Sequence, residues 1–279
     1  MSREKRVNIL YKCKKCIFPL FSLIFISLLS ACQPAGLSPK ERWQHANGSA
    51  YTAQISDDAS LSVVSSMHHG ISLWDLNNDA LKYTWYQQQN TADNLVLLTD
   101  ISADNSYVMS ASKKDFALWN TKTGQSAGYW KVRNSSIRDI AVSNEGKYLL
   151  IGKGNGTVVH VTLATGRRLE FLGHKNTEYS IEDGIPAAGY KINSVDLLPN
   201  GRIAISGAND YIAYVWDTLS GQVIYQFNHP SRITKVALDS NARYAFTADS
   251  KKSAYIWDLK TGKLVSKLQH NKRQSVFST

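Results

Sequence analysis

The sequence predicts an all-β fold built from repeated units of four short strands. Two observations lead to this prediction. Alternating apolar runs that end in tryptophan recur at intervals of about 42 residues, and turn signals split each interval into strand-length pieces. The 279-residue chain contains 10% aromatic residues and 17 glycines, a composition that suits a β-rich protein with many tight turns.

Five anchor positions define the repeat. Tryptophan occupies four of them and valine the third, and in the last four copies a glycine five residues later marks a turn between two strands. The anchors are Trp74, Trp119, Val161, Trp216 and Trp257, and they lie 45, 42, 55 and 41 residues apart.

A second register supports the first. Eleven residues after each anchor lies a large apolar residue, and in three copies a histidine follows two residues later. The apolar positions are Trp85, Trp130, Leu172, Phe227 and Leu268, and the histidines are His174, His229 and His270. Four short strands in each period are typical of a propeller blade, whose strands are too short to form a stable sheet singly.

Residues 38–279 resemble the WD-repeat β-propeller family. The segment from Gly207 to Asp217 matches the family's repeat motif, and Gly173-His174 matches its glycine-histidine pair. The resemblance implies four-stranded antiparallel blades in which a histidine, a strand serine or threonine, a turn aspartate and the tryptophan are hydrogen-bonded. The residues carried over to this structural blade network are His174, Ser206, Asp210, Trp216, His229, Trp257, His270, Trp74 and Trp119.

Three departures from the family pattern weaken this expected network. Lys251 stands where the turn aspartate of the last blade is expected, and Val161 replaces a tryptophan. The first two blades lack the histidine. We therefore expect these two blades to depend more on apolar packing.

The repeat count predicts five complete blades and two outer fragments of a sixth. Glu41–His45 is interpreted as an outermost strand and Gln274–Ser278 as an innermost strand, with no sequence left for the two strands between them. A truncated or open ring is the preferred interpretation. The alternatives are a ring distorted to close on five blades and a partner strand that completes the sixth blade.

The N-terminus is predicted to be a lipoprotein signal peptide, residues 1–31. A basic stretch precedes an uncharged run from Ile17 to Leu29, which is too short to span a bilayer as a helix. Leu29-Ser30-Ala31-Cys32 resembles the lipobox of bacterial lipoproteins; a plain signal peptide with a chance cysteine is the alternative. The resemblance implies lipidation of Cys32, a tether over residues 32–40 and the propeller at 41–279. Gln33 resembles the outer-membrane sorting pattern, so we expect an outer-membrane lipoprotein that faces the periplasm.

The charge distribution argues against a nucleic-acid-binding protein. The chain has 32 Lys and Arg against 22 Asp and Glu, a formal net charge of +10, but half of this excess lies in residues 1–15. The other half is dispersed over basic doublets near turns, which are usually solvated. None of the three cysteines lies beyond Cys32, so the predicted mature protein has neither a disulfide nor thiol chemistry.

The long third period is explained by an insertion in the connection 175–191. Its aromatic and acidic residues suit a protein interface, whereas a loop that folds over the central channel is an equally weighted alternative. The candidate partner-binding residues are Glu178, Tyr179, Ile181, Glu182, Asp183 and Tyr190.

No catalytic site is predicted, and we expect no metal and no cofactor. The sequence shows no nucleophile elbow, glycine-rich phosphate loop or repeated carboxylate pair, and His68-His69 lacks the further ligands of a metal site. The expected function is a lipid-anchored scaffold that binds envelope proteins and no nucleic acid. The alternative is a propeller that binds a small molecule, metal or quinone-type cofactor as a periplasmic sensor or oxidoreductase.

Overall fold

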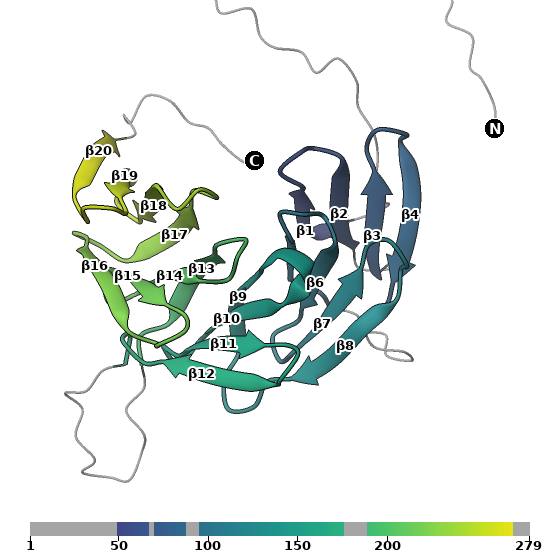
Figure 1. Cartoon of the computed structure of the whole chain (residues 1–279), viewed down its shortest axis with the longest axis horizontal. Coiled ribbons are helices and arrows are strands. Elements are labelled where there is room, and N and C mark those ends of the chain that lie inside the picture. The colour runs from purple at the N-terminus through teal and green to yellow at the C-terminus, as the bar shows by residue number, and fades with distance from the viewer. Residues whose placement is uncertain (1–48, 67–69, 88–94, 176–188, 270–279) are drawn as a thin grey trace, which may run out of the picture. The chain divides into compact units, whose positions relative to one another are not determined.

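The structure, a computed structural model, describes residues 49–66, 70–87, 95–175 and 189–269. The chain divides into two units, residues 1–43 and residues 44–279, and all described residues lie in the second. Within the described residues the chain forms twenty β-strands and one 3-10 turn, Asn144–Gly146, with no α-helix (Figure 1).

The strands form five sheets of four, and each sheet is an antiparallel meander in chain order. Blade 1 consists of β1 (Ala50–Ile55), β2 (Leu61–Ser66), β3 (Gly70–Asp75) and β4 (Ala80–Trp85). Blade 2 consists of β5 (Leu98–Ile101), β6 (Tyr107–Ala111), β7 (Asp115–Asn120) and β8 (Ser126–Lys131). Blade 3 consists of β9 (Ile137–Val142), β10 (Tyr148–Lys153), β11 (Val158–Thr162) and β12 (Arg167–Phe171). Blade 4 consists of β13 (Ile192–Leu197), β14 (Ile203–Ala208), β15 (Ile212–Asp217) and β16 (Val223–Asn228). Blade 5 consists of β17 (Ile233–Leu238), β18 (Tyr244–Asp249), β19 (Ser253–Asp258) and β20 (Leu264–Gln269).

This architecture confirms the predicted all-β fold with five four-stranded blades. The innermost strand of each blade contacts that of the next, so that β1, β5, β9, β13 and β17 form a continuous series. Within the described residues the series ends at β17 without returning to β1, and the ring is not closed (Figure 1). Both predicted fragments of a sixth blade, Glu41–His45 and Gln274–Ser278, lie outside the described residues.

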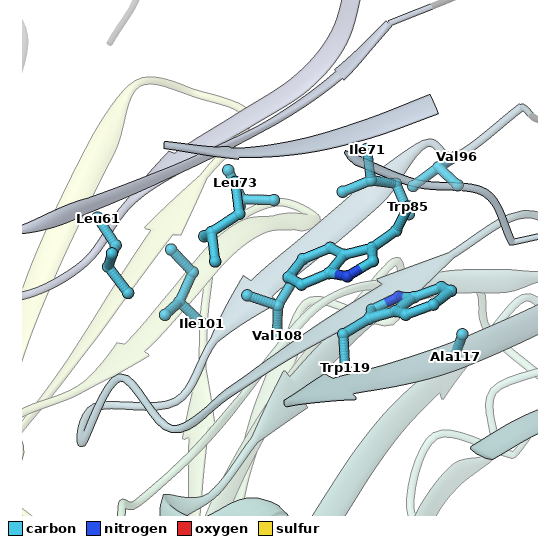
Figure 2. Packing of buried hydrophobic residues seen from close by; sticks show 10 residues of the cluster. Leu61, Ile71, Leu73, Trp85, Val96, Ile101, Val108, Ala117 and Trp119 are labelled. Carbon is cyan, nitrogen blue, oxygen red and sulfur yellow. The ribbon is translucent and has the colours of Figure 1, made fainter. Parts of the chain in front are cut away.

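Apolar side chains from facing blades fill the seams between them. At the first seam Leu73 of β3 and Trp85 of β4 pack with Val108 of β6 and Trp119 of β7, and none of the four is more than 8% exposed (Figure 2). Because an inner blade is covered on both faces, its middle strands are buried along most of their length; β10, for example, is buried at five of its six positions.

The outer face of blade 5 has no covering blade among the described residues. Phe227 on β16 is 3% exposed because blade 5 covers it, whereas Leu268, at the equivalent position on β20, is 54% exposed. Val215 on β15 is fully buried, and its equivalent Ile256 on β19 is only half-buried. Blade 5 therefore ends the stack with an uncovered apolar face.

The aspartate or asparagine after each anchor tryptophan closes the turn that leads to the fourth strand. Asp217 Oδ1 accepts the backbone N–H groups of Leu219 at 3.0 Å and Ser220 at 2.7 Å. Asp258 makes the same two bonds in blade 5, and these hydrogen bonds lower the pKa of both carboxyls. Gly221 follows with a φ of +77°, a conformation that glycine adopts without strain.

Candidate functional site

A buried hydrogen-bond network joins blade 3 to blade 4. Trp216 Nε1 donates to Ser206 Oγ at 2.8 Å, and this hydroxyl lies 2.8 Å from His174 Nε2. Since the hydroxyl accepts from the indole, its own proton is directed to Nε2. The other ring nitrogen, Nδ1, then donates to Asp210 Oδ2 at 2.7 Å. His174 is fully buried, so the network fixes both its orientation and its tautomer.

Blade 2 forms the same network without a histidine, which corrects our expectation that it would depend on apolar packing. Trp119 Nε1 donates to Ser110 Oγ at 2.8 Å, and Ser110 donates to Gln87 Oε1 at 2.9 Å. Gln87 Nε2 then donates to Asp115 Oδ1 at 2.7 Å. The glutamine amide offers one acceptor and one donor in the places where His174 offers its two nitrogens. Gln87 follows Trp85 by two residues, the same spacing as the histidines, so the sequence did contain the signal.

The network in blade 5 stops halfway. Trp257 Nε1 donates to Thr247 Oγ1 at 2.8 Å, and this hydroxyl lies 3.1 Å from His229 Nε2. His229 Nδ1 is buried without a hydrogen-bond partner among the described residues, because Lys251 replaces the turn aspartate. Burial lowers the pKa of His229 to about 4, an effect that the charge of Asp249 opposes. The imidazole is therefore neutral near pH 7.

Blade 3 has Val161 and Ile151 in place of the anchor tryptophan and the strand serine, and its register differs from the other blades. Four blades contain a β-bulge just before the anchor tryptophan, whereas β11 pairs with β12 without a bulge at Val161. Without this extra residue the buried aromatic comes ten residues after the anchor: Phe171 is 1% exposed and Leu172 is 48% exposed. The predicted spacing of eleven, which assigned Leu172 to this position, was wrong in this blade.

Three aspartates of the innermost strands link consecutive blades, and sequence analysis did not identify them. Each carboxylate accepts a backbone N–H from the next innermost strand: Val142 N to Asp100 at 2.7 Å, Val195 N to Asp139 at 2.9 Å and Leu238 N to Asp196 at 2.7 Å. Gln54 also donates to Asp100, at 3.0 Å. Burial raises the pKa of Asp100 to about 7 and that of Asp196 to about 6, and the neighbouring carboxylates add to both rises. Asp100 and Asp196 occupy equivalent positions of their strands, whereas Asp139 does not, and their contacts emerge only when the blades are stacked.

The loops at the two ends of the strands differ in charge. At one end of each blade lie the turn between its second and third strands and the connection to the next blade. We call this end of the stack the connection face. Backbone hydrogen bonds join its turns and connections, for example Asn209 N to Lys191 O and Ser250 N to Arg232 O, both 3.0 Å. Its described loops contain eight basic residues and one acid, the buried Asp210; the basic residues are Lys113, Lys114, Arg133, Lys175, Lys191, Arg232, Lys251 and Lys252.

At the opposite end of each blade lie the turn between its first and second strands and the turn between its third and fourth strands. We call this end of the stack the hairpin face. Its described loops contain six basic and six acidic residues, so its formal charge is balanced. The basic residues are Lys122, Lys147, Arg202, Arg243, Lys260 and Lys263, and the acidic residues are Asp57, Asp58, Asp79, Asp104, Glu145 and Asp239. Within the described loops the excess of positive charge therefore lies on the connection face; Asp93, Glu178, Glu182 and Asp183 of its connections lie outside the described residues.

Several predicted residues lie outside the described parts of the chain. They are Cys32, His68, His69, His270 and, in the insertion, Glu178, Tyr179, Ile181, Glu182 and Asp183. Tyr190 is described: it is 42% exposed, on the connection face, and its backbone N–H donates to His174 O at 2.8 Å. Trp74 is half-buried on β3.

The described residues contain no group of three His, Cys, Asp or Glu side chains arranged to hold a metal ion. None of their secondary-structure elements is a helix with the length and apolar character needed to cross a membrane. The polar clusters that they do contain, the blade networks and the three aspartates, have their hydrogen bonds directed to other blade residues.

Two segments of the chain match the family model of the WD domain, G-beta repeat, at residues 185–217 and 221–258. The chain is 22% identical over 184 residues to Pre-mRNA-processing factor 19 of Caenorhabditis elegans, covering 66% of this chain and 35% of the relative. It is 27% identical over 175 residues to WD repeat-containing protein SL1-17 of Schistosoma mansoni, covering 62% of this chain and 52% of the relative. The first match spans about a third of its relative, and the second spans about half of its relative. These matches support the resemblance of the chain to WD-repeat proteins.

Proposed function

We propose that this chain is a lipid-anchored scaffold of the bacterial envelope, and that its connection face binds an acidic protein. The charge difference between the two loop faces carries the proposal: eight basic residues and one buried acid on the connection face, against a balanced hairpin face. A positive patch favours association with an acidic partner and accelerates the encounter at low ionic strength.

Exposed aromatic side chains on the same face suit a protein interface. Tyr190 is 42% exposed and Tyr211 is 52% exposed, and both belong to connection-face loops of blade 4. Tyrosine is enriched among the residues that contribute most to binding, because it combines a large apolar ring with a hydroxyl group. The polar clusters of the blades hydrogen-bond to other blade residues and stabilise the scaffold.

The anchor is proposed from the sequence around Cys32. The lipobox resemblance makes Cys32 the lipidated residue, and an extended tether of eight residues reaches at most about 26 Å. The scaffold would then act close to the membrane surface, and the sorting pattern at Gln33 favours the periplasmic side of the outer membrane.

Fractionation tests this anchor: Cys32→Ser should move the protein from the membrane to the soluble fraction and abolish labelling by palmitate. Retention of the variant in the outer membrane would contradict lipid anchoring.

Site-specific photo-crosslinking in membranes tests the interface. A photo-reactive side chain at Tyr211 should crosslink to an envelope protein, whereas the same group at Leu219, 62% exposed on the hairpin face, should not. Lys251→Glu combined with Lys252→Glu should abolish the Tyr211 crosslink, while Lys260→Glu combined with Lys263→Glu on the hairpin face should leave it intact. Equal crosslinking from both faces, or indifference to the charge reversal, would contradict the proposal.

A further inference from the structure

Three of the described seams between blades are closed by stacked aromatic rings. Trp85 stacks on Trp119 with centroids 5.3 Å apart and an angle of 12° between the rings (Figure 2). Phe171 stacks on Trp216 at 5.0 Å, and Phe227 stacks on Trp257 at 4.2 Å. In each pair the anchor tryptophan covers the aromatic residue of the preceding blade.

The seam between blades 2 and 3 lacks this stack. Val161 occupies the anchor position, so Trp130 of β8 has no indole to cover it and stacks instead on Phe116 of its own blade, at 5.1 Å. Ile151 takes the place of the serine that receives the indole N–H in blades 2 and 4. The exchange of tryptophan for valine removes most of a ring system from this seam.

A cavity of about 740 Å³ lies at this seam, bounded by β8 on one side and β10, β11 and β12 on the other. Trp130, Leu149 and Val161 are among its apolar walls. Its volume falls in the range of about 300–1,000 Å³ that is usual for small-molecule sites. We attribute the cavity to the missing anchor tryptophan, because the seams that contain the stack are filled by it.

The charged groups around the cavity are five basic residues and one acid: Lys131, Arg133, Lys153, Arg168, Lys175 and Glu170. Lys153 is only 8% exposed, and within the described parts of the chain its ammonium group has no hydrogen-bond acceptor or carboxylate partner. The ammonium nitrogen is not fully buried, so a carboxylate in the cavity could pair with it. A charge-assisted hydrogen bond of this kind would favour an anionic ligand.

We propose that the cavity between blades 2 and 3 binds a small amphipathic carboxylate, with its apolar body against Trp130 and Val161 and its carboxylate beside Lys153. The apolar walls favour the body of such a ligand, and the excess of basic residues favours its head. The cavity shares Arg133 and Lys175 with the connection face, but the two proposals rest on different observations and neither requires the other.

Calorimetric titration with four probes tests both parts of the ligand. The full chain is used with Cys32→Ser, so that no attached acyl chain competes for the cavity. Decanoate, held below its micelle-forming concentration, should bind at least tenfold more tightly than acetate, which lacks the apolar body. It should also bind at least tenfold more tightly than 1-decanol or decyltrimethylammonium, which have the body without the negative charge. Equal binding of decanoate and decyltrimethylammonium would overturn the proposal.

Two variants locate the site. Val161→Phe should fill the cavity and weaken decanoate binding at least tenfold; phenylalanine is chosen because Ile151 could not accept an indole N–H. The matched control, Val223→Phe on the exposed face of β16, should bind like the parent chain. Lys153→Met retains most of the side-chain volume without the charge and should abolish the preference for decanoate over 1-decanol, whereas Lys252→Met should not. Unchanged binding in Val161→Phe and Lys153→Met would show that decanoate binds elsewhere and would refute the assignment.

Discussion

Gln87 donates a 2.7 Å hydrogen bond to Asp115 and accepts one from Ser110, so it performs in blade 2 the role that His174 performs in blade 4. The two side chains differ in shape, yet each offers an acceptor to the strand serine and a donor to an aspartate, which is Asp115 at the start of β7 in one case and Asp210 in the β14–β15 turn in the other. A side-chain amide can therefore replace the imidazole in this network.

Replacement of Gln87 should distinguish the hydrogen bonds from simple packing. Gln87→Leu removes the acceptor of the buried Ser110 hydroxyl and one of the donors to Asp115, which keeps its bond from Ser112. We expect the variant to lower the free energy of unfolding by about 2 kcal/mol. Gln87→His restores both bonds and should remain within about 1 kcal/mol of the wild type. Denaturant unfolding followed by tryptophan fluorescence measures both values. A Gln87→Leu variant as stable as the wild type would contradict a stabilising role for the network.

The incomplete network of blade 5 should be repairable. Lys251→Asp places a carboxylate where Asp210 stands in blade 4, and His229 Nδ1 would then have an acceptor. We expect the free energy of unfolding to rise by about 1 kcal/mol. The pKa of His229 should rise from about 4, because the new carboxylate stabilises the protonated ring.

Nuclear magnetic resonance titration of His229 and denaturant unfolding test this repair together. Lys252→Asp, which introduces the same charge one residue away, serves as the matched control. A rise in the pKa of His229 that is equally large in the control would show a general charge effect in place of a new hydrogen bond.

Asp100 should make stability fall as the pH rises. Its folded-state pKa is about 7 against 3.8 for an ordinary aspartate, so the folded protein binds more protons than the unfolded chain between these values. Stability from this group is thus fully present below about pH 4 and is lost as the pH rises through 7. His160 and His229, whose burial lowers their pKa to about 4, act in the opposite direction between pH 4 and 6.5.

The variant Asp100→Asn isolates the aspartate from the two histidines. Asparagine stays neutral and can still accept the N–H of Val142, so the variant should gain stability relative to the wild type as the pH is raised from 4 to 8. A rise in pKa from 3.8 to about 7 corresponds to about 4 kcal/mol at about 1.36 kcal/mol per pKa unit. We expect a smaller gain, about 2 kcal/mol, because the side chain is partly exposed. Unfolding curves at four pH values measure the difference. A difference that does not vary with pH would contradict the raised pKa.

The uncovered end of the stack predicts unequal costs for two similar truncations. Phe227→Ala should destabilise the protein by about 3–5 kcal/mol, because blade 5 covers that ring. Leu268→Ala, at the equivalent position of blade 5, should cost less than about 1 kcal/mol because this side chain is already largely solvated. Equal and large losses from both variants would indicate that the outer face of blade 5 is covered in solution.

Sequence patterns predicted the blades well because their signals are local. The anchor tryptophans, the turn glycines and the alternating apolar runs lie within one repeat, and the strands formed where they indicated. The residues His174, Ser206, Asp210 and Trp216 could be named in advance because a repeated motif marks them. Leu172 was assigned wrongly, because the register of the fourth strand depends on a one-residue bulge that blade 3 lacks.

The contacts between blades could not be predicted in the same way. Asp100 and Val142 lie 42 residues apart, and Asp139 and Val195 lie 56 apart, so only the stacking of blades brings them together. The cavity beside Val161 also depends on where the neighbouring Trp130 turns when no ring covers it.

The sequence by itself determined five four-stranded blades and the structural residues of the complete network, and it predicts a lipoprotein signal peptide that lies outside the described residues. Only the tertiary structure decided that Gln87 substitutes for a histidine, that positive charge gathers on one face and that a cavity opens at the third repeat. The physical reason is that hydrophobic periodicity and turn chemistry act over a few neighbouring residues, whereas burial, charge and packing volume are set by residues that meet across blades.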